Sequence, residues 1–333
     1  MTGHSFDVLG IGNAIMDILA RTDDDFLVRE GLAKGSMRLI DTEEAERLYS
    51  HMGPARMVSG GCAGNTMAGV ASFGGKAAFI GKVAADELGR AYGHDIRAIG
   101  VHFDTPVLEA GAPTARSMIL VTPDGERTMN TYLGACTHLT PDDIDPEVVG
   151  AAGITYLEGY LWDPQAAKEA FRVAAGIAHA RGRLVALTLS DSFCVDRYRP
   201  EFLDLIRSGT VDIVFANAAE VRSLYQTADF GTALAGLRQD AKLAAVTLSE
   251  AGSLVVTREE TVQVDAHPVE TVADTTGAGD LYAAGFLFGL ARGYDMETCA
   301  RFGGLAAAEI ISHLGARPEA DLADLARQSG LLR

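Results

Sequence analysis

Short apolar runs alternate with longer amphipathic stretches along most of the chain. The runs have the length and composition of buried strands, and the longer stretches have helical spacing. The expected strands are Asp7–Gly12, Ala77–Lys82, Ile154–Tyr160, Leu184–Leu189, Ile213–Ala216 and Ala244–Leu248. The expected helices are Thr42–Met52, Asp86–Ile99, Pro164–Ala180, Pro200–Arg207 and Glu319–Ser329. This alternation predicts an α/β fold with a doubly wound, mostly parallel sheet flanked by helices.

Two parts of the chain break this rhythm and predict a separate β element. They contain extended runs without intervening helices, and a turn over Pro123–Glu126 joins two of these runs as a hairpin. The runs are Met16–Thr22, Ser36–Asp41, Val101–Glu109 and Thr114–Leu133. We therefore expect one domain over residues 1–333, into which a small β lid from about 14–41 and 101–135 is inserted.

Composition narrows the class of protein. The chain has 333 residues, of which 48% are hydrophobic and 22% charged, as in a globular enzyme. Its net charge of −17 argues against nucleic acid or an anionic membrane as a partner. The four cysteines form no C-x-x-C pair, no basic-then-apolar leader opens the chain, and no apolar run could span a bilayer. We expect a cytoplasmic protein with reduced thiols and no structural metal.

The segment Asp274-Thr275-Thr276-Gly277-Ala278-Gly279-Asp280 lies directly before a helical run of apolar and small residues. The first N–H groups of a helix lack internal partners and carry positive charge, so they bind phosphate. Gly277 and Gly279 let the backbone approach an anion closely. Asp280 would accept the proton of an attacking hydroxyl. The alternative is an ordinary glycine turn whose aspartate favours a helix start.

This segment resembles the signature of the ribokinase-like (PfkB) family of carbohydrate and nucleoside kinases. The resemblance implies that Asp280 is the catalytic base and that the Gly277, Ala278 and Gly279 backbone forms an anion hole for the transferred phosphoryl group. It also implies ATP and Mg²⁺ as cofactors. In that family the extra β segments form a lid over the acceptor.

A second motif, Asn217-Ala218-Ala219-Glu220, follows an apolar strand, at the edge where ligands bind in open α/β sheets. By resemblance, Asn217 and Glu220 organise Mg²⁺ and its waters around the nucleotide phosphates, and Glu220 reaches the ion through water, as this ion's preference for retained waters allows. The alternative is a capping box at a helix start, in which Asn217 and Glu220 serve only the backbone.

A third motif, Ser59–Asn65, resembles the family's acceptor motif, in which Gly60, Gly61 and Asn65 contact sugar hydroxyls. Its Cys62 is expected to be a buried filler. Upstream, Asn13 and Asp17 follow the first strand, and the resemblance makes Asp17 the carboxylate that accepts two vicinal hydroxyls. A solvated aspartate at a strand edge is the alternative. A dinucleotide fingerprint would need a glycine where Ile15 stands, so a dehydrogenase is not expected.

Weaker resemblances concern the donor and a cation. Thr247, Ser249 and Gly252 match a loop near the nucleotide, although Ser249 replaces a glycine that is common there. Asp274 and Thr276 match a monovalent-cation site, which adds K⁺ as an optional cofactor.

The lid hairpin carries Arg116 and Arg127, and the resemblance implies that an arginine from this region reaches the substrate. We take Arg127 as that residue. The alternative, an exposed arginine without a role, is equally open for both.

Together these motifs predict ATP-dependent phosphorylation of the primary 5'-hydroxyl of a nucleoside. Adenosine is favoured because Gly12–Ile18 and Asn130–Ala135 resemble the adenosine-kinase branch. A sugar kinase acting on ribose, fructose or a related furanose is the main alternative, and a non-catalytic nucleoside or sugar sensor is the second. Monomer and homodimer are both open.

Overall fold

The protein is described by a computed structural model that covers residues 5–332. Its main element is an eight-stranded sheet in the order β13-β12-β11-β10-β9-β8-β1-β5. Six of these strands are parallel, and β12 and β13 add an antiparallel hairpin at one edge. The bounds are β1 Phe6–Ile11, β5 Ala77–Ile80, β8 Ala152–Glu158, β9 Leu184–Thr188, β10 Ile213–Asn217, β11 Leu243–Thr247, β12 Ser253–Thr257 and β13 Thr261–Val264.

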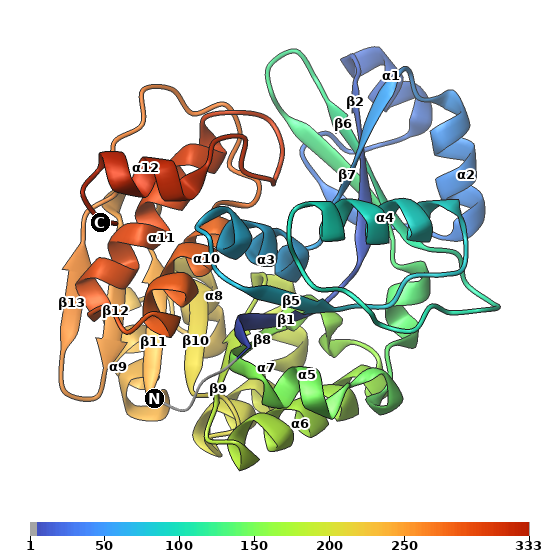
Figure 1. Cartoon of the computed structure of the whole chain (residues 1–333). Coiled ribbons are helices and arrows are strands. Elements are labelled where there is room, and N and C mark those ends of the chain that lie inside the picture. Colours follow the sequence, from blue (N-terminus) through green and yellow to red (C-terminus); the bar gives the residue numbers. More distant parts are fainter. Residues whose placement is uncertain (1–4, 333) are drawn as a thin grey trace.

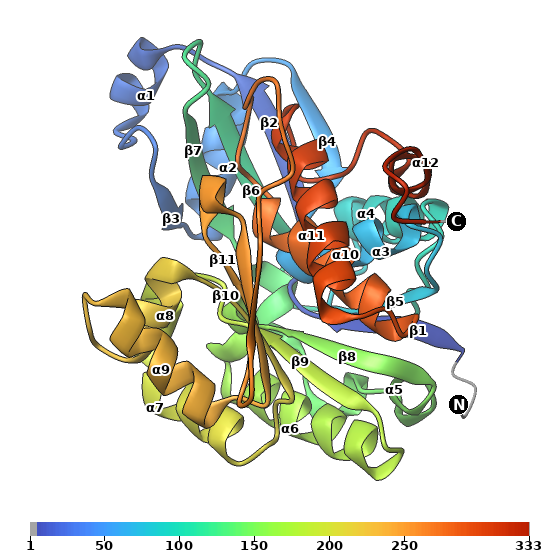
Figure 2. The ribbon, with the colours of Figure 1, turned by 90° about the vertical axis from the view of Figure 1, so that its left-hand side faces the viewer.

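Helices cover both faces of this sheet (Figures 1 and 2). Successive strand residues contribute to opposite faces, as Val8 and Leu9 of β1 show by packing into two different apolar cores. One face carries α3 Cys62–Ser72, α4 Glu87–Ala98, α10 Ala278–Ala291, α11 Met296–Ile311 and α12 Leu322–Gln328. The other carries α5 Pro146–Gly150, α6 Gln165–Ala180, α7 Ser192–Arg207, α8 Ala218–Leu224 and α9 Phe230–Asp240. The predicted doubly wound α/β fold is confirmed.

Small residues let α10 pack closely against two neighbouring helices. A Cβ added at Gly69 of α3 would lie 2.6 Å from the Cβ of Ala284, and one at Gly285 would lie 2.3 Å from the carbonyl oxygen of Phe302 in α11. Either substitution would force the helices apart, so glycine is required for their close packing. The start of α10 is thereby fixed beside the start of α3.

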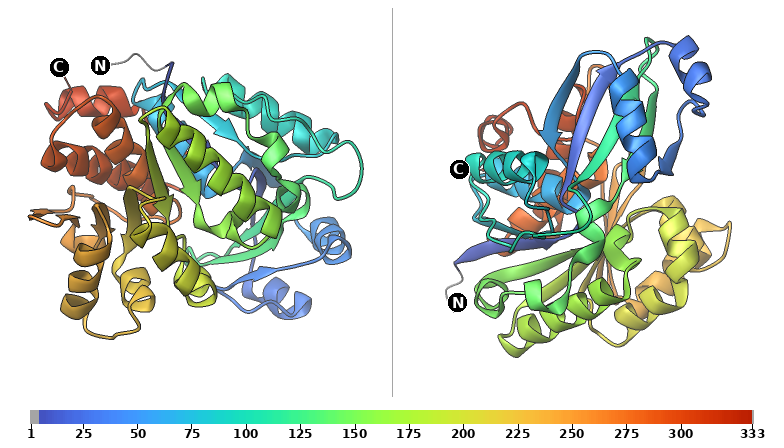
Figure 3. Two further views of the ribbon diagram at one scale, coloured as in Figure 1. Left: turned by 90° about the horizontal axis from the view of Figure 1, so that it is seen from below. Right: turned by 90° about the vertical axis from the view of Figure 1, so that its right-hand side faces the viewer.

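A second sheet of five strands, which we call the lid sheet, lies beside the large sheet (Figure 3). Its strand order is β3-β7-β6-β2-β4. Its strands are β2 Ile15–Arg21, β3 Met37–Leu39, β4 Ala55–Ser59, β6 Ala115–Val121 and β7 Arg127–Tyr132. Met16 and Ile18 of β2 are buried in a core with Ala45 and Leu48 of α2 Thr42–His51, which leaves Asp17 on the opposite face. The lid sheet thus has one packed face and one face available to a ligand.

The structure corrects the sequence-based prediction of the lid in three places. The chain between β2 and β3 contains a helix, α1 Asp24–Glu30, whose start is capped by the Asp23 side chain and whose end is a left-handed Gly31. The strand β4, which was not expected, forms one edge of the sheet. The run Val101–Glu109 is not a strand of the lid sheet. It forms only isolated bridges, from His102 to Ala78 of β5 and from Leu108 to Ala84.

One predicted helix is the second half of a longer, kinked helix. The helix α7 begins at Ser192 and has a kink at Tyr198, whose dihedral angles are not helical, so the stretch predicted from Pro200 is the second of its two helical segments. Proline lacks an N–H and clashes with the preceding turn of a helix, so a kink two residues before Pro200 is expected.

Candidate active site

A cavity of about 630 Å³ lies between the lid sheet and the carboxyl edge of the large sheet. Five neighbouring strands end at this edge, and each contributes a side chain to the wall at or just after its last residue. In the order of the strands from β1 to β11, these residues are Asn13, Glu158, Thr188, Asn217 and Thr247. Neighbouring strands are about 4.8 Å apart, so the row extends for roughly 19 Å. The cavity can therefore hold two ligands end to end.

The loop before α10 opens directly onto this cavity, and Gly277, Ala278 and Gly279 all line it. Gly277 caps the helix with φ +78°, and an added Cβ would lie 3.0 Å from that of Ala316. Residues other than glycine rarely adopt this left-handed backbone conformation, so the turn requires a glycine at this position. The first N–H groups of a 14-residue helix consequently face the cavity.

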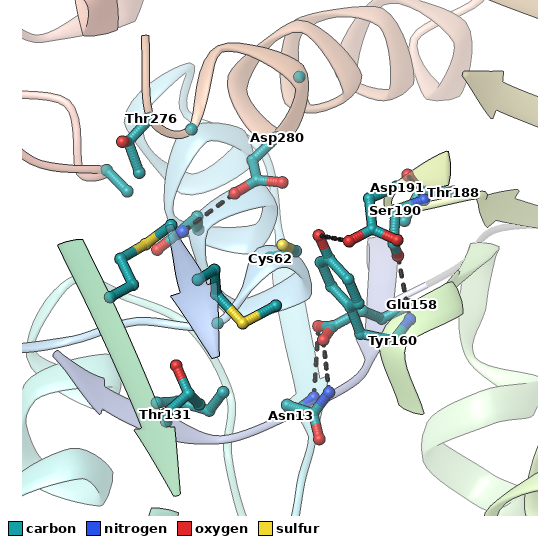
Figure 4. Close-up of a pocket in the computed structure, with 18 of the residues that line it drawn as sticks. Asn13, Cys62, Thr131, Glu158, Tyr160, Thr188, Ser190, Asp191, Thr276 and Asp280 are labelled. Carbon is teal, nitrogen blue, oxygen red and sulfur yellow. Dashed lines mark hydrogen bonds between the residues drawn. The ribbon is translucent and has the colours of Figure 1, made fainter. Parts of the chain in front are cut away.

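Asp280 lies in the first turn of α10 and also lines the cavity (Figure 4). Its Oδ2 accepts a 3.0 Å hydrogen bond from Nδ2 of Asn65, which belongs to the neighbouring helix α3. Burial raises the pKa of Asp280 to about 6, while the Asn65 bond and the Arg317 guanidinium act in the opposite direction. The other polar atom of Asn65, Oδ1, is buried without a hydrogen-bond partner among the described residues. It can accept a hydrogen bond from a ligand hydroxyl.

The acceptor residues expected from the sequence surround Asp17, which projects from the open face of the lid sheet. A Cβ added at Gly60 would lie 2.3 Å from its Oδ2, so only glycine fits beside this carboxylate. Gly61 has φ +85°, and its added Cβ would lie 2.0 Å from the carbonyl oxygen of Asn13. Burial raises the pKa of Asp17 to about 7, and Arg317 and Arg127 lower it.

Glu158 at the end of β8 was missed by the sequence analysis. Its carboxylate accepts bonds from Asn13 Nδ2 at 2.7 Å and from the Asn13 N–H at 3.3 Å (Figure 4). It also accepts a bond from the Ala63 N–H at 2.9 Å. Burial raises its pKa to about 7. The signal that could have revealed it is its place after the apolar run Ile154–Leu157, at the carboxyl end of a strand.

Arg317 was also missed. It lies after the end of α11 and connects this part of the chain to the acceptor motif Ser59–Asn65. It donates to the Ser59 carbonyl at 2.7 Å, to the Gly64 carbonyl at 2.7 Å and to the Ser59 hydroxyl at 3.0 Å. Its positive charge lowers the pKa of both Asp17 and Asp280. A lone arginine in an irregular segment gives no sequence signal, because its partners lie about 250 residues earlier.

At the other end of the cavity, Asn217 and Glu220 form the capping box that was considered as an alternative. Asn217 Oδ1 accepts from the Glu220 N–H at 2.9 Å, and Glu220 accepts from the Asn217 N–H at 3.0 Å. Both side chains also line the cavity, so capping and ligand contact are compatible. Burial raises the pKa of Glu220 to about 7.

Thr247 lines the cavity, whereas Ser249 and Gly252 lie in the turn between β11 and β12, away from the wall. Ser249 has φ +53°, a left-handed backbone conformation that favours glycine, the residue that the family resemblance leads one to expect at this position. An added Cβ at Gly252 would lie 2.0 Å from the Val264 carbonyl oxygen, so this glycine is needed for packing the turn.

Arg127 and Asp274 are brought together, but away from the main cavity. The buried Arg127 guanidinium pairs with the Asp274 carboxylate, which also accepts from the Thr276 N–H at 3.0 Å and the Gly315 N–H at 3.1 Å. Arg127 instead lines a small neighbouring pocket with Asp17. Asp274, the carboxylate predicted to bind a monovalent cation, is thus paired with Arg127.

Two features are absent from residues 5–332. No group of three or more His, Cys, Asp or Glu side chains could hold a metal ion there. None of the helices within that range is long and apolar enough to cross a membrane.

Comparison with known proteins gives consistent matches. Residues 31–322 match the model of the pfkB family carbohydrate kinases. The structure of adenosine kinase from Sinorhizobium meliloti is 62% identical with a TM-score of 0.92, and the match covers 97% of this chain and 99% of that one. The structure of a probable sugar kinase from Rhizobium etli CFN 42 is 56% identical with a TM-score of 0.93, covering 99% and 100%. Adenosine kinase from Saccharomyces cerevisiae is 25% identical, covering 92% of this chain and 94% of that one.

Proposed function

The chain belongs to the pfkB family of carbohydrate kinases, and from this membership we propose that it transfers the γ-phosphoryl group of ATP to the 5'-hydroxyl of a nucleoside, adenosine foremost. The enzyme class follows from the family: it is a kinase that phosphorylates an alcohol group. The observation that carries the proposal is the placement of Asp280. Its carboxylate lies in the first turn of α10, beside the first N–H groups of that helix and inside the cavity that also contains Asp17.

The acceptor would bind at the end of the cavity formed by the lid sheet and α3. Asp17 can accept hydrogen bonds from two vicinal hydroxyls, and Asn13 and Asn65 add amide contacts. The absence of side chains at Gly60 and Gly61 lets the ring approach the backbone. The unpartnered Asn65 Oδ1 supports this assignment, because a buried acceptor without a bond is costly until a ligand supplies one.

Asp280 would remove the proton from the 5'-hydroxyl as its oxygen attacks phosphorus. Its pKa of about 6 leaves it mostly ionised at neutral pH and still basic enough to accept the proton. The N–H groups of Gly277, Ala278 and Gly279 would stabilise the charge on the transferred group. Catalysis would depend mainly on positioning and electrostatics.

The donor end has the chemistry that ATP with Mg²⁺ requires. Backbone N–H groups at α10 suit phosphate, and Thr247 and Asn217 add neutral polar groups. Mg²⁺ keeps several waters, so the single carboxylate of Glu220 fits an outer contact better than direct coordination. Ser249 and Gly252 would shape the adjoining turn. When bound, Mg·ATP supplies the phosphoryl group and neutralises part of its charge.

The family resemblance also suggests potassium near Asp274 and Thr276. Arg127 already places a positive charge on Asp274. We propose potassium as an effector only in states where Arg127 leaves this carboxylate to contact the substrate.

Adenosine is favoured because two of the reported relatives are adenosine kinases and the lid sheet presents an apolar wall, with Ile15, Ile119, Met129 and Leu133, that suits a nucleobase. A sugar kinase is the second candidate, supported by the Rhizobium etli relative. The proposal involves a small-molecule partner, no nucleic acid and no membrane, and a cytoplasmic location.

The test measures ADP release from Mg·ATP with adenosine, other nucleosides, ribose and fructose. We expect turnover with adenosine, and a loss of at least about 10² in kcat in Asp280→Asn. Asp204→Asn, the same change on an exposed part of α7, should retain full activity. Turnover of a sugar without adenosine would reject the nucleoside assignment, and a loss below about tenfold in Asp280→Asn would reject the base.

A further inference from the structure

The pairing register of the lid sheet aligns four residues in one row across four strands. Asp17 of β2 pairs with Ser117 of β6, Ser117 pairs with Thr131 of β7, and Thr131 pairs with Leu39 of β3. Paired residues project from the same face of a sheet. This face is the one that lines the cavity, and all four residues are found in its wall.

Ser117 and Thr131 form a hydroxyl pair at the centre of this row. Their oxygens are 2.8 Å apart, and the two residues are only 5% and 8% exposed. The wall around them is apolar, since Ile119 and Met129 are their neighbours on the same strands. Figure 4 shows Thr131 on the side of the cavity opposite Tyr160. Two polar groups in an apolar wall are therefore directed at whatever fills this part of the cavity.

The pair can offer one hydrogen to a ligand. It has two hydroxyl hydrogens, and one of them lies between the two oxygens. The second is free to be donated, and a ligand that buries it without accepting it would leave a costly unpaired donor. The ligand atom that lies here should therefore be a hydrogen-bond acceptor.

The row also sets the distance between this donor and the diol site. Strands are about 4.8 Å apart, so Ser117 and Thr131 lie roughly 5 and 10 Å from Asp17 along the sheet. A furanose whose diol is held by Asp17 could reach Ser117 but not Thr131, about 10 Å away. In a nucleoside the base occupies this region, and its ring acceptors nearest the ribose are the purine nitrogens N3 and N7.

We propose that the Ser117–Thr131 hydroxyl pair donates a hydrogen bond to N3 or N7 of a purine base and so selects purine nucleosides over free sugars. This inference depends on the proposed nucleoside kinase function. It assigns acceptor selectivity to the centre of the lid sheet, one to two strands away from the carboxylate that holds the ribose.

The first experiment changes only the ligand. Steady-state kcat/KM is measured for the unmodified enzyme with adenosine and its 3-deaza, 7-deaza and 1-deaza analogues, in which one ring nitrogen is replaced by C–H. We expect a loss of about tenfold for the 3-deaza or the 7-deaza compound, because the donor loses its acceptor. The 1-deaza compound is the control, since N1 lies at the far edge of the base. Losses below twofold for both the 3-deaza and 7-deaza compounds, or a loss confined to the 1-deaza compound, would overturn the proposal.

The second experiment changes the protein. The double variant Ser117→Ala/Thr131→Val keeps nearly the same shape but has no hydroxyl hydrogen, and Thr261→Val on the exposed strand β13 is the matched control. We expect the preference for adenosine over the sensitive analogue to fall to within twofold in the double variant and to persist in the control. Persistence in a folded double variant would overturn the proposal. If the unmodified enzyme does not phosphorylate adenosine at all, the proposed function fails instead, so the two failures are distinguishable.

Discussion

Glu158→Gln tests the electrostatics of the acceptor site through protein stability. Glu158 is 1% exposed, and its carboxylate accepts three hydrogen bonds from Asn13 and Ala63. The substitution removes the ionisable group with little change of shape. The Asn13 amide can turn to present its oxygen to the new NH₂ group, so the local network can be kept.

The magnitude follows from the pKa of the carboxyl group, which burial raises from 4.5 to about 7. A raised carboxyl pKa in the folded state favours the protonated form, so its stabilising contribution is complete below pH 4.5 and is lost as pH rises through 7. Between pH 5.5 and pH 8 the linkage relation gives a loss of about 2 kcal/mol in the free energy of unfolding from this one group. The unmodified protein should therefore lose about 2 kcal/mol more over this range than Glu158→Gln.

The assay is urea unfolding of the ligand-free protein at pH 5.5 and pH 8, followed by circular dichroism. Glu259→Gln, the same change in the exposed turn between β12 and β13, should keep the pH dependence of the unmodified protein. A pH dependence in Glu158→Gln within about 0.5 kcal/mol of that of the unmodified protein would refute the reasoning, because the carboxyl would then titrate alike in the folded and unfolded chains.

Three further predictions concern catalysis. Activity should fall as pH drops below about 6, where Asp280 is protonated, and Arg317→Met should move this limb to higher pH, since the guanidinium lowers the pKa of Asp280; an unmoved limb in the pH profile of kcat/KM would contradict this. Gly61→Ala should raise KM for the acceptor about tenfold or more and leave KM for ATP unchanged, because its Cβ would lie 2.0 Å from the Asn13 carbonyl oxygen; initial rates with each substrate varied would show equal effects if the loop were not an acceptor contact. Activation by KCl should be stronger in Arg127→Met than in the unmodified enzyme, since Asp274 has lost its positive partner in every state of the variant; equal activation of both enzymes by KCl, with NaCl as the control, would contradict this.

The fold was largely predictable because its determinants are local. Buried strands such as Ile213–Asn217 are continuous apolar runs, and their alternation with amphipathic helices leaves few other architectures. The errors occur where tertiary contacts override the local pattern. Residues Ala55–Ser59 are mostly exposed and form a run of only five residues, and they become β4 by pairing with β2.

The candidate site was predictable where a short motif contains its own chemistry, as between Asp274 and Asp280. Side chains that reach the cavity from isolated places in the sequence could not be predicted. Arg317 follows an irregular turn after α11, so nothing local distinguishes it, and Glu158 is marked only by its place at the end of an apolar strand. Their contribution arises from the helix packing and strand register that bring distant segments together.

The charge distribution of the cavity also orients the two substrates. Asp17, Glu158 and Asp280 place three carboxyl groups at the end formed by the lid sheet and β1, and burial raises the pKa of each. A polyanion entering this end would add repulsion to that cost, whereas a neutral nucleoside brings hydroxyl donors that carboxylates accept. The end at β10 and β11 presents neutral polar groups and the single carboxyl of Glu220, and the α10 N–H groups lie between the two ends. ATP is therefore expected to approach from the β11 side and to meet the acceptor hydroxyl at Asp280. The fold thus determines which end of the cavity each substrate occupies before either one binds.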